Sequence, residues 1–289
     1  MAKLLPILAL SGLGTIGVGG WYGFSGLRPK DLQQYLEWQG FELASKKGGN
    51  VWKSILDEHK EIVKTRIGKD SPSEQDIQDW CSSHISRKDY ESFKDDASKI
   101  CVNNPQTVRA KIIQLNGSIS SLIENSSYSK DEEYKVAYIF RKHIEGISEL
   151  IGFAPPPKEE GQEVVENIQE GGEALKKWCV KSLEAKPDDS LVANVKALCS
   201  PKGFKTIKEL ITKQNETSKL LTDPSNTTEL QNKYNEIKEK ASWTKDKPQE
   251  SNEQESLKKW CEENEKKNFY EEGTFSNVYP KFRFRCLKA

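Results

Sequence analysis

The chain has 289 residues, with 44 lysine and arginine side chains, 44 aspartate and glutamate side chains, and a formal net charge of zero. Bulk electrostatic capture of nucleic acid needs a basic surplus, so the composition argues against a nucleic-acid partner. Aromatic residues make up 9% of the chain, which is too many for a disordered protein. The length predicts two or three domains of ordinary size.

The amino-terminal segment is uncharged over a length that fits a membrane. Residues 4–27 lie between Lys3 and Arg28 and carry no charged side chain. About 20 apolar residues span a bilayer core, so we expect residues 1–27 to be a signal-anchor that crosses the cell membrane once. A cleaved signal peptide and a buried helix are the alternatives. The flanking charges are too few to set the orientation.

The six cysteines form a regular pattern. Three of them directly follow a tryptophan, at Trp80-Cys81, Trp178-Cys179 and Trp260-Cys261. Each is followed by one more cysteine, Cys101, Cys199 or Cys286, after 20, 20 and 25 residues. Tryptophan and cysteine are both scarce in this chain, so three such dipeptides indicate an internal repeat.

The residues around the Trp-Cys dipeptides repeat as well. Apolar residues recur at i, i+3, i+4 and i+8, the stripe of an amphipathic helix. The positions are Ile77, Trp80, Cys81 and Ile85; then Leu175, Trp178, Cys179 and Leu183; then, for the first half only, Leu257, Trp260 and Cys261. Ser73 and Asp76 fit an N-cap signal for the first of these helices.

In the first two repeats the second cysteine ends another helical pattern, so each repeat predicts a helical hairpin with its cysteines on facing stripes. The third repeat departs from this pattern. Gly273 and Pro280 interrupt it, and residues 282–285 alternate in polarity, as a short strand or an extended arm would. Two further helical patterns precede each Trp-Cys helix, so we expect about four short helices in each repeat.

The fold class that follows is all-α, with strand signals nearly absent. We expect a transmembrane helix followed by three tandem helical units: unit 1 (residues 28–104), unit 2 (residues 105–202) and unit 3 (residues 203–289). Each unit carries one Trp-Cys helical hairpin.

Three roles for the cysteines remain open. Disulfides fit the even count, the regular pairing and an exported chain, and predict the bonds Cys81–Cys101, Cys179–Cys199 and Cys261–Cys286. Reduced cysteines that pack as small hydrophobic residues are the first alternative. The second is metal or nucleophilic chemistry, since His84 lies one turn from Cys81. Ser182 and Asn264 take the place of His84 in the other units, which argues against a repeated metal or catalytic site.

No other motif in the chain predicts catalysis or a cofactor. Glycine loops for phosphates, GxSxG and HExxH are missing from the sequence. We therefore expect no enzyme activity, no cofactor and no metal site. Residues 281–285 alternate basic and aromatic side chains, a pattern that could stack bases or contact lipid headgroups. We expect this strip to pack against its own unit instead.

The combination of features is similar to a known group of proteins. It comprises a Met-Ala-Lys-Leu-Leu start, a glycine-rich apolar span, a Val-Trp-Lys-x-x-Leu helix at Val51–Leu56, an Asp-Trp-Cys helix at Asp79–Cys81 and a closing cysteine. This resembles the large paralogous families of membrane-anchored proteins in haemotropic mycoplasmas. Many of those proteins look like one such unit behind one span, whereas this chain looks like three in tandem.

The resemblance implies a surface protein without an assigned activity. We expect a structural or interaction role, as a contact to the host or as a variable antigen, with a protein partner and with most of the chain outside the cell. The alternative is a small-ligand binding module held at the membrane; an enzyme is the least favoured class.

Overall fold

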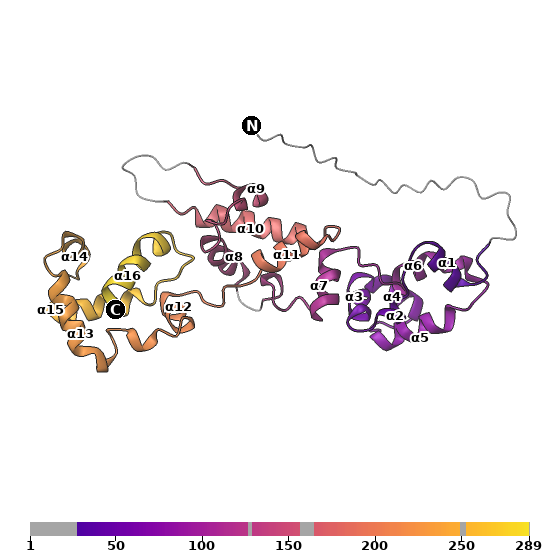
Figure 1. The fold of residues 1–289 in the computed structure, drawn as a ribbon, viewed down its shortest axis with the longest axis horizontal. Coiled ribbons are helices and arrows are strands. Elements are labelled where there is room, and N and C mark those ends of the chain that lie inside the picture. The colour runs from indigo at the N-terminus through magenta and orange to yellow at the C-terminus, as the bar shows by residue number, and fades with distance from the viewer. Residues whose placement is uncertain (1–27, 127–128, 157–164, 249–252, 289) are drawn as a thin grey trace, which may run out of the picture.

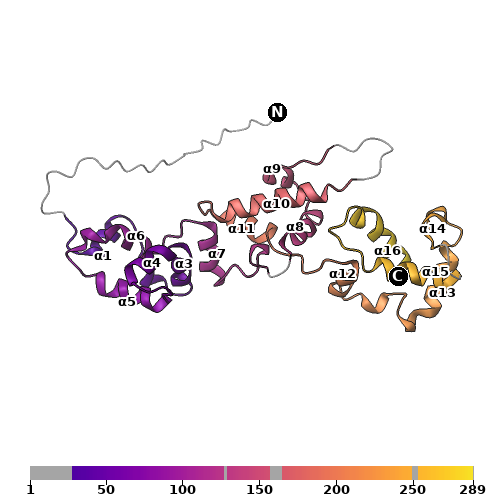
Figure 2. The same ribbon diagram turned by 180° about the vertical axis from the view of Figure 1, so that it is seen from behind.

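The computed structural model describes residues 28–126, 129–156, 165–248 and 253–288. Within these ranges the chain forms sixteen α-helices and no β-strand, which confirms the all-α expectation. The helices are arranged along an elongated molecule, with unit 1 at one end, unit 2 in the middle and unit 3 at the other end (Figure 1). The view from behind shows the same order (Figure 2).

The predicted membrane span, residues 4–27, lies outside the described residues. Among the helices in the described ranges, none combines the length and the apolar character that crossing a bilayer requires. The signal-anchor at residues 1–27 therefore stays a prediction from the sequence.

Unit 1 contains six short α-helices around one core. Their bounds are α1 Leu32–Trp38, α2 Ala44–Lys47, α3 Val51–Glu58, α4 Lys60–Ile67, α5 Glu74–His84 and α6 Lys94–Ile100, with a 3-10 turn at Tyr90–Ser92. The core is one cluster of buried residues that extends from Leu32 to Val102. Both cysteines of the unit belong to it.

Unit 2 contains five α-helices and a core of its own. The bounds are α7 Val108–Asn116, α8 Lys130–Ile139, α9 Ile147–Ile151, α10 Ile168–Leu183 and α11 Asp189–Leu198, with a 3-10 turn at Ile123–Asn125. The buried cluster extends from Val108 to Cys199. The 16-residue helix α10 carries the Trp-Cys dipeptide of this unit.

Unit 3 also contains five α-helices. The bounds are α12 Ile207–Lys213, α13 Thr227–Ile237, α14 Ala241–Asp246, α15 Glu253–Asn264 and α16 Tyr279–Cys286, with 3-10 turns at Thr217–Lys219 and Pro224–Asn226 and a π-helix, η5, at Thr274–Val278. Its core extends from Phe204 to Leu287 and also takes in Val136, Ile139 and Ile168 of unit 2. Apart from these three residues, the cores fall within the ranges expected for the units; the unit limits themselves stay a prediction.

The carboxyl-terminal segment differs from its expected form. Residues 282–285 belong to helix α16, so the prediction of a strand or extended arm is wrong. Pro280 lies in the first turn of this helix, where its fixed φ suits the helix. The π-helix η5 leads into α16 after Gly273, whose φ of +78° favours glycine.

Each unit has more helices than the four expected. Glycines in the left-handed region separate them: Gly68 follows α4, Gly117 follows α7, and Gly146 precedes α9. Helix starts agree better with the sequence. Ser73 and Asp76 form a reciprocal capping box at α5, as predicted from their spacing.

The same backbone hydrogen bonds close all three units. The first N–H of the first helix donates to the carbonyl six residues after the Trp-Cys cysteine: Leu32 to Arg87 at 3.0 Å, Val108 to Ala185 at 2.9 Å, and Ile207 to Lys267 at 3.1 Å. The carbonyl of each second cysteine accepts from the segment after the first helix: Ala44 to Cys101 at 2.9 Å, Ile123 to Cys199 at 2.8 Å, and Leu221 to Cys286 at 2.8 Å. Each unit is thus closed on itself at equivalent points.

Helices α8 and α10 approach each other closely because α10 contains two glycines. A Cβ atom at Gly171 would lie 2.1 Å from Cζ of Tyr138, and one at Gly172 would lie 2.8 Å from Cγ of Lys135. Both glycines are buried inside the helix, where each costs about 1 kcal/mol of helix propensity relative to alanine. Close contact between the two helices explains why glycine is found there.

We predict that Gly171→Ala destabilises unit 2. The added methyl gains about 1 kcal/mol of helix propensity, but the overpacking against Tyr138 costs about 1–3 kcal/mol. Hydrogen exchange in the α8 and α10 backbones should become faster. When Tyr138→Ala is also present, Gly171→Ala should cause no further loss of stability beyond that of Tyr138→Ala alone. Slower hydrogen exchange in the Gly171→Ala variant than in the unsubstituted protein would contradict the close approach of the two helices.

Candidate functional site

All six predicted site cysteines form disulfides. The bonds are Cys81–Cys101, Cys179–Cys199 and Cys261–Cys286, with Cα–Cα distances of 5.6, 5.8 and 5.7 Å. The pairs are those that the spacing favours, and the disulfide interpretation is supported. Every one of the six is buried, with at most 6% of its surface exposed. The disulfides therefore belong to the cores.

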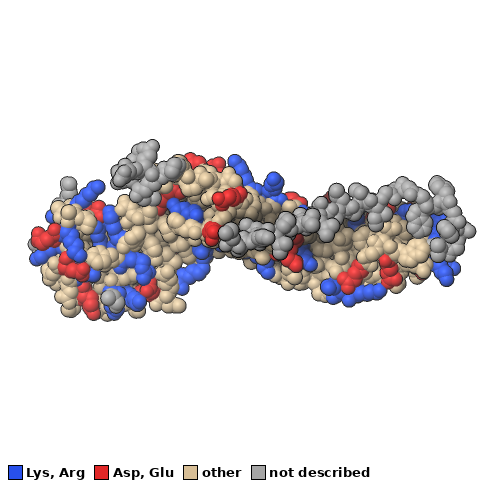
Figure 3. All heavy atoms as spheres, turned by 45° about the horizontal axis from the view of Figure 1, so that its top comes forward, with Lys and Arg blue, Asp and Glu red and all other residues tan. Residues whose placement is uncertain are grey.

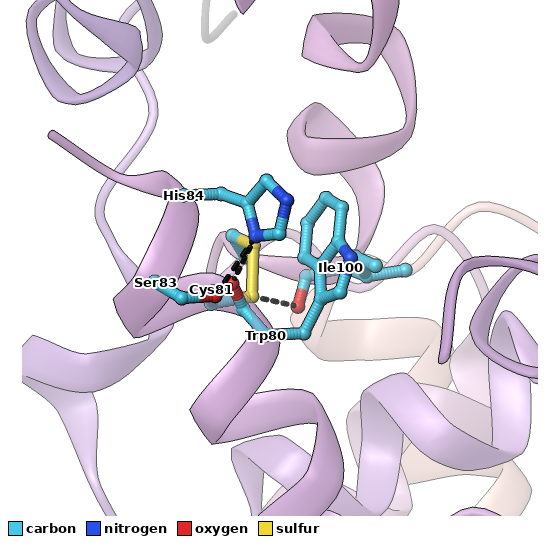
Figure 4. Close-up of a disulfide and its surroundings, with 6 residues drawn as sticks. Trp80, Cys81, Ser83, His84 and Ile100 are labelled. Atoms are coloured by element: carbon cyan, nitrogen blue, oxygen red, sulfur yellow. Dashed lines mark hydrogen bonds between the residues drawn. A yellow bond between two sulfur atoms is a disulfide. The ribbon is translucent and has the colours of Figure 1, made fainter. Parts of the chain in front are cut away.

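The zinc alternative at Cys81, His84 and Cys101 meets a geometric obstacle. A cysteine binds zinc as a thiolate, and the sulfurs of Cys81 and Cys101 are both committed to the disulfide. Nδ1 of His84 lies 2.7 Å from the carbonyl oxygen of Trp80, in its own helix (Figure 4). Within the described residues no group of three or more histidine, cysteine or acidic side chains is placed to hold a metal.

The tryptophan next to each disulfide takes a different position in each unit. Trp260 is buried at 7% exposure, with its ring 6.4 Å from that of Trp243. Trp178 is half-buried against the core of unit 2. Trp80 is also half-buried, and it stacks on His84 at 4.2 Å while Phe93 meets it edge-on at 6.0 Å. Unit 1 therefore presents an aromatic surface beside its disulfide.

The basic-aromatic strip at residues 281–285 mostly packs against its own unit, as expected. Phe282 is fully buried and Arg285 is 2% exposed. The Arg285 guanidinium lies between Trp243 and Trp260, with Cζ at 5.4 and 4.7 Å from the ring centroids, and Nη1 donates to Asp246 at 2.9 Å. Phe284 differs, because 47% of its surface is exposed.

A surface groove on unit 2 is the main feature that sequence reasoning missed. It lies between α8 and α10, has a volume of about 550 Å³, and is mainly apolar. Its lining residues are Asp131, Tyr134, Lys135, Gln169, Gly172, Glu173, Lys176, Lys177, Val180 and Lys181. The Gly171-Gly172 pair was the signal in the sequence, since two glycines inside a helical pattern often mark a close approach.

The groove has basic groups along its edge. Lys176 pairs with Asp131 at 2.8 Å, and Gln169 donates to Glu173 at 2.6 Å. Lys177 and Lys181 have no ion pair within the described part of the chain. The groove can thus offer apolar contact and at least two available ammonium groups.

Comparison with protein-family models, with curated proteins and with solved structures finds no match to this chain.

We predict that the six thiols are all oxidised in the native protein. Alkylation under denaturing, non-reducing conditions should add no adduct, and alkylation after reduction should add six. Replacing Cys179 and Cys199 together by alanine should lower the stability of unit 2 by about 3 kcal/mol, the chain-entropy value for a loop of this length. In this double variant, faster hydrogen exchange should be confined to unit 2. In the native protein, thiol adducts that form before reduction would refute the pairing of the cysteines.

The attachment of α16 should depend on pH. Hydrogen bonds from Arg283 and then Lys219 lower the pKa of Glu216 from 4.5 to about 2. Because the folded pKa is depressed, this stabilisation is fully present above pH 4.5 and is lost as the pH falls toward 2. Hydrogen exchange in α16 should accelerate over this range, corrected for the intrinsic pH dependence of exchange. The Glu216→Gln variant, which cannot titrate there, should lack this component, and a Glu216 titration midpoint near 4.5 would contradict the attachment.

Proposed function

We propose that the chain is a single-pass membrane-anchored surface protein, built from three tandem copies of one disulfide-closed helical unit, with a structural or interaction role. The observation that carries the proposal is the repeated closure. In each unit a disulfide joins the Trp-Cys helix to the last helix, and the carbonyl of the second cysteine accepts a backbone hydrogen bond from the segment after the first helix.

Disulfides support an external location for the units. They form and persist in oxidising surroundings and are rare in the reducing cytosol. Together with the uncharged segment at residues 4–27, three disulfides favour a chain that is exported and held at the membrane. Small units with limited cores gain most from such bonds.

An interaction role is supported by the surfaces that the units present. On the face shown in Figure 3, acidic and basic side chains are interspersed, a distribution that favours solubility. Trp80 and His84 form a half-buried aromatic pair in unit 1, and the buried Phe93 meets both rings edge-on. Cζ of Arg87 lies 5.0 Å from the centroid of the Phe93 ring. Tryptophan and arginine are enriched among the residues that dominate protein interfaces. A protein partner, such as a host surface protein, fits this group better than a substrate for catalysis.

We predict that unit 3 is reached from outside the cell. In the full chain expressed in a bacterial membrane, Thr228→Cys should react with a bulky, membrane-impermeant maleimide on intact cells. Thr228 is exposed on α13, so access does not require unfolding. The native cysteines are buried and paired, so they should react only after reduction and denaturation.

The matched control is Ala2→Cys, on the other side of the predicted span. It should react only after lysis if the chain crosses the membrane once. Labelling of Thr228→Cys only after lysis would place the units inside and refute surface display. Recovery of the chain in the soluble fraction would refute the anchor.

A further inference from the structure

The groove between α8 and α10 has the dimensions of a small-ligand site. Its volume of about 550 Å³ lies within the range of about 300–1,000 Å³ that is usual for such sites. The lining positions on α10 extend from Gln169 to Lys181, which corresponds to about 18 Å at the helical rise. The groove is therefore long enough to hold an extended chain.

The two ends of the groove differ in charge. At one end Lys135 lies across Gly172, close to Glu173, which is itself bound by Gln169. In the middle Asp131 pairs with Lys176. At the other end the groove is lined by Lys177, Val180 and Lys181, and it has no acidic lining residue there. One end is thus basic, and the remainder is electrically balanced.

The walls of the groove indicate which kind of extended chain would fit. Both walls are α-helices, whose backbone groups are already hydrogen-bonded within the helices. An extended peptide would therefore find no backbone partners in these walls, unlike a peptide that adds to the edge of a sheet. An alkyl chain needs no such partners. The 41%-exposed Val180 and the stems of the lysines offer it apolar contact.

We propose that this groove binds a single-chain amphipathic anion, with its alkyl chain along α10 and its charged head at Lys177 and Lys181. The charge of these two ammonium groups complements the anionic head, and the apolar walls take the chain. The inference does not depend on which side of the membrane the units occupy. It gives unit 2 a binding activity beyond the proposed display role.

The test uses the full chain in its membrane and a photoreactive dodecanoate as the probe. Irradiation should attach the probe to residues 131–135 and 169–181, as mapped by peptide mass spectrometry. Unlabelled dodecanoate should compete, whereas butanoate, which lacks the chain, and dodecanol, which lacks the charge, should compete at least about tenfold less well.

The double variant Lys177→Glu/Lys181→Glu should reduce attachment in the groove by about tenfold or more. The matched control is Lys259→Glu, which changes the exposed residue before the tryptophan of unit 3 just as Lys177 precedes Trp178. It should leave attachment unchanged. Hydrogen exchange in α8 and α10 shows whether the double variant remains folded, because both charges lie at the surface.

Three outcomes would overturn the proposal. Attachment confined to residues 1–27 would show that the probe only dissolves in the bilayer. Equal attachment in the double variant and the control, with both folded, would show that the two lysines do not bind the head. Equal competition by butanoate and dodecanoate would show a simple anion site without a chain-binding groove.

Discussion

The second cysteine of each unit is the residue on which the rest of the structure depends. Its side chain is bonded to the Trp-Cys helix, and its carbonyl accepts a hydrogen bond from the segment that follows the first helix. One residue therefore joins three segments that are far apart in the sequence. This closure matters because most of the helices are short. Isolated helices below about 12–15 residues are marginal in water, so their stability must come from tertiary contacts.

The joint between units 1 and 2 contains buried and part-buried polar contacts. Between units 1 and 2, the buried Ser54 hydroxyl donates to the carbonyl of Ala110 at 2.9 Å, and Glu58 accepts from the hydroxyl of Thr107 at 2.7 Å. Ala110 and Thr107 both lie at the start of α7, so these contacts attach α3 of unit 1 to the first helix of unit 2. If the angle between the two units changed, the buried donor and acceptor would lose their hydrogen bond, which costs free energy. These contacts therefore favour a fixed angle between the units.

Between units 2 and 3, two carboxylates bind reciprocally. Glu166, which is fully buried, accepts from the backbone N–H groups of Gly273 at 2.7 Å and Ser276 at 2.5 Å. Glu272 accepts from the N–H groups of Glu166 and Ile168, at the start of α10. Each carboxylate thus satisfies donors at the beginning of a helix in the other segment, a favourable place for negative charge. Together with Val136 and Ile139, which enter the core of unit 3, this joint makes the two units continuous.

The sequence predicted what depends on local pattern and missed what depends on tertiary contacts between distant segments of a unit. The Trp-Cys stripes, the capping box at Ser73 and the cysteine pairs could be recognised because helical spacing and cap chemistry are local. The helix at residues 282–285 was missed because its alternating polarity comes from tertiary packing: Arg285 is buried between two tryptophans, which no local rule anticipates. The groove was missed for the same reason. It requires α8 and α10 to meet at Gly171, and this contact joins residues that are far apart in the sequence.

The helices α3 and α8, which contact the following unit, differ from α13 in what they contact. In units 1 and 2, residues of α3 and α8 contact the following unit, through Ser54 and Val136. Helix α13 holds the corresponding place in unit 3, but its exposed positions are polar, among them Thr228 and Asn232. A polar outer face of this kind opposes stacking of another helical unit on α13. By contrast, Trp80 in unit 1 is half-buried, and the α8–α10 groove in unit 2 presents a mainly apolar surface.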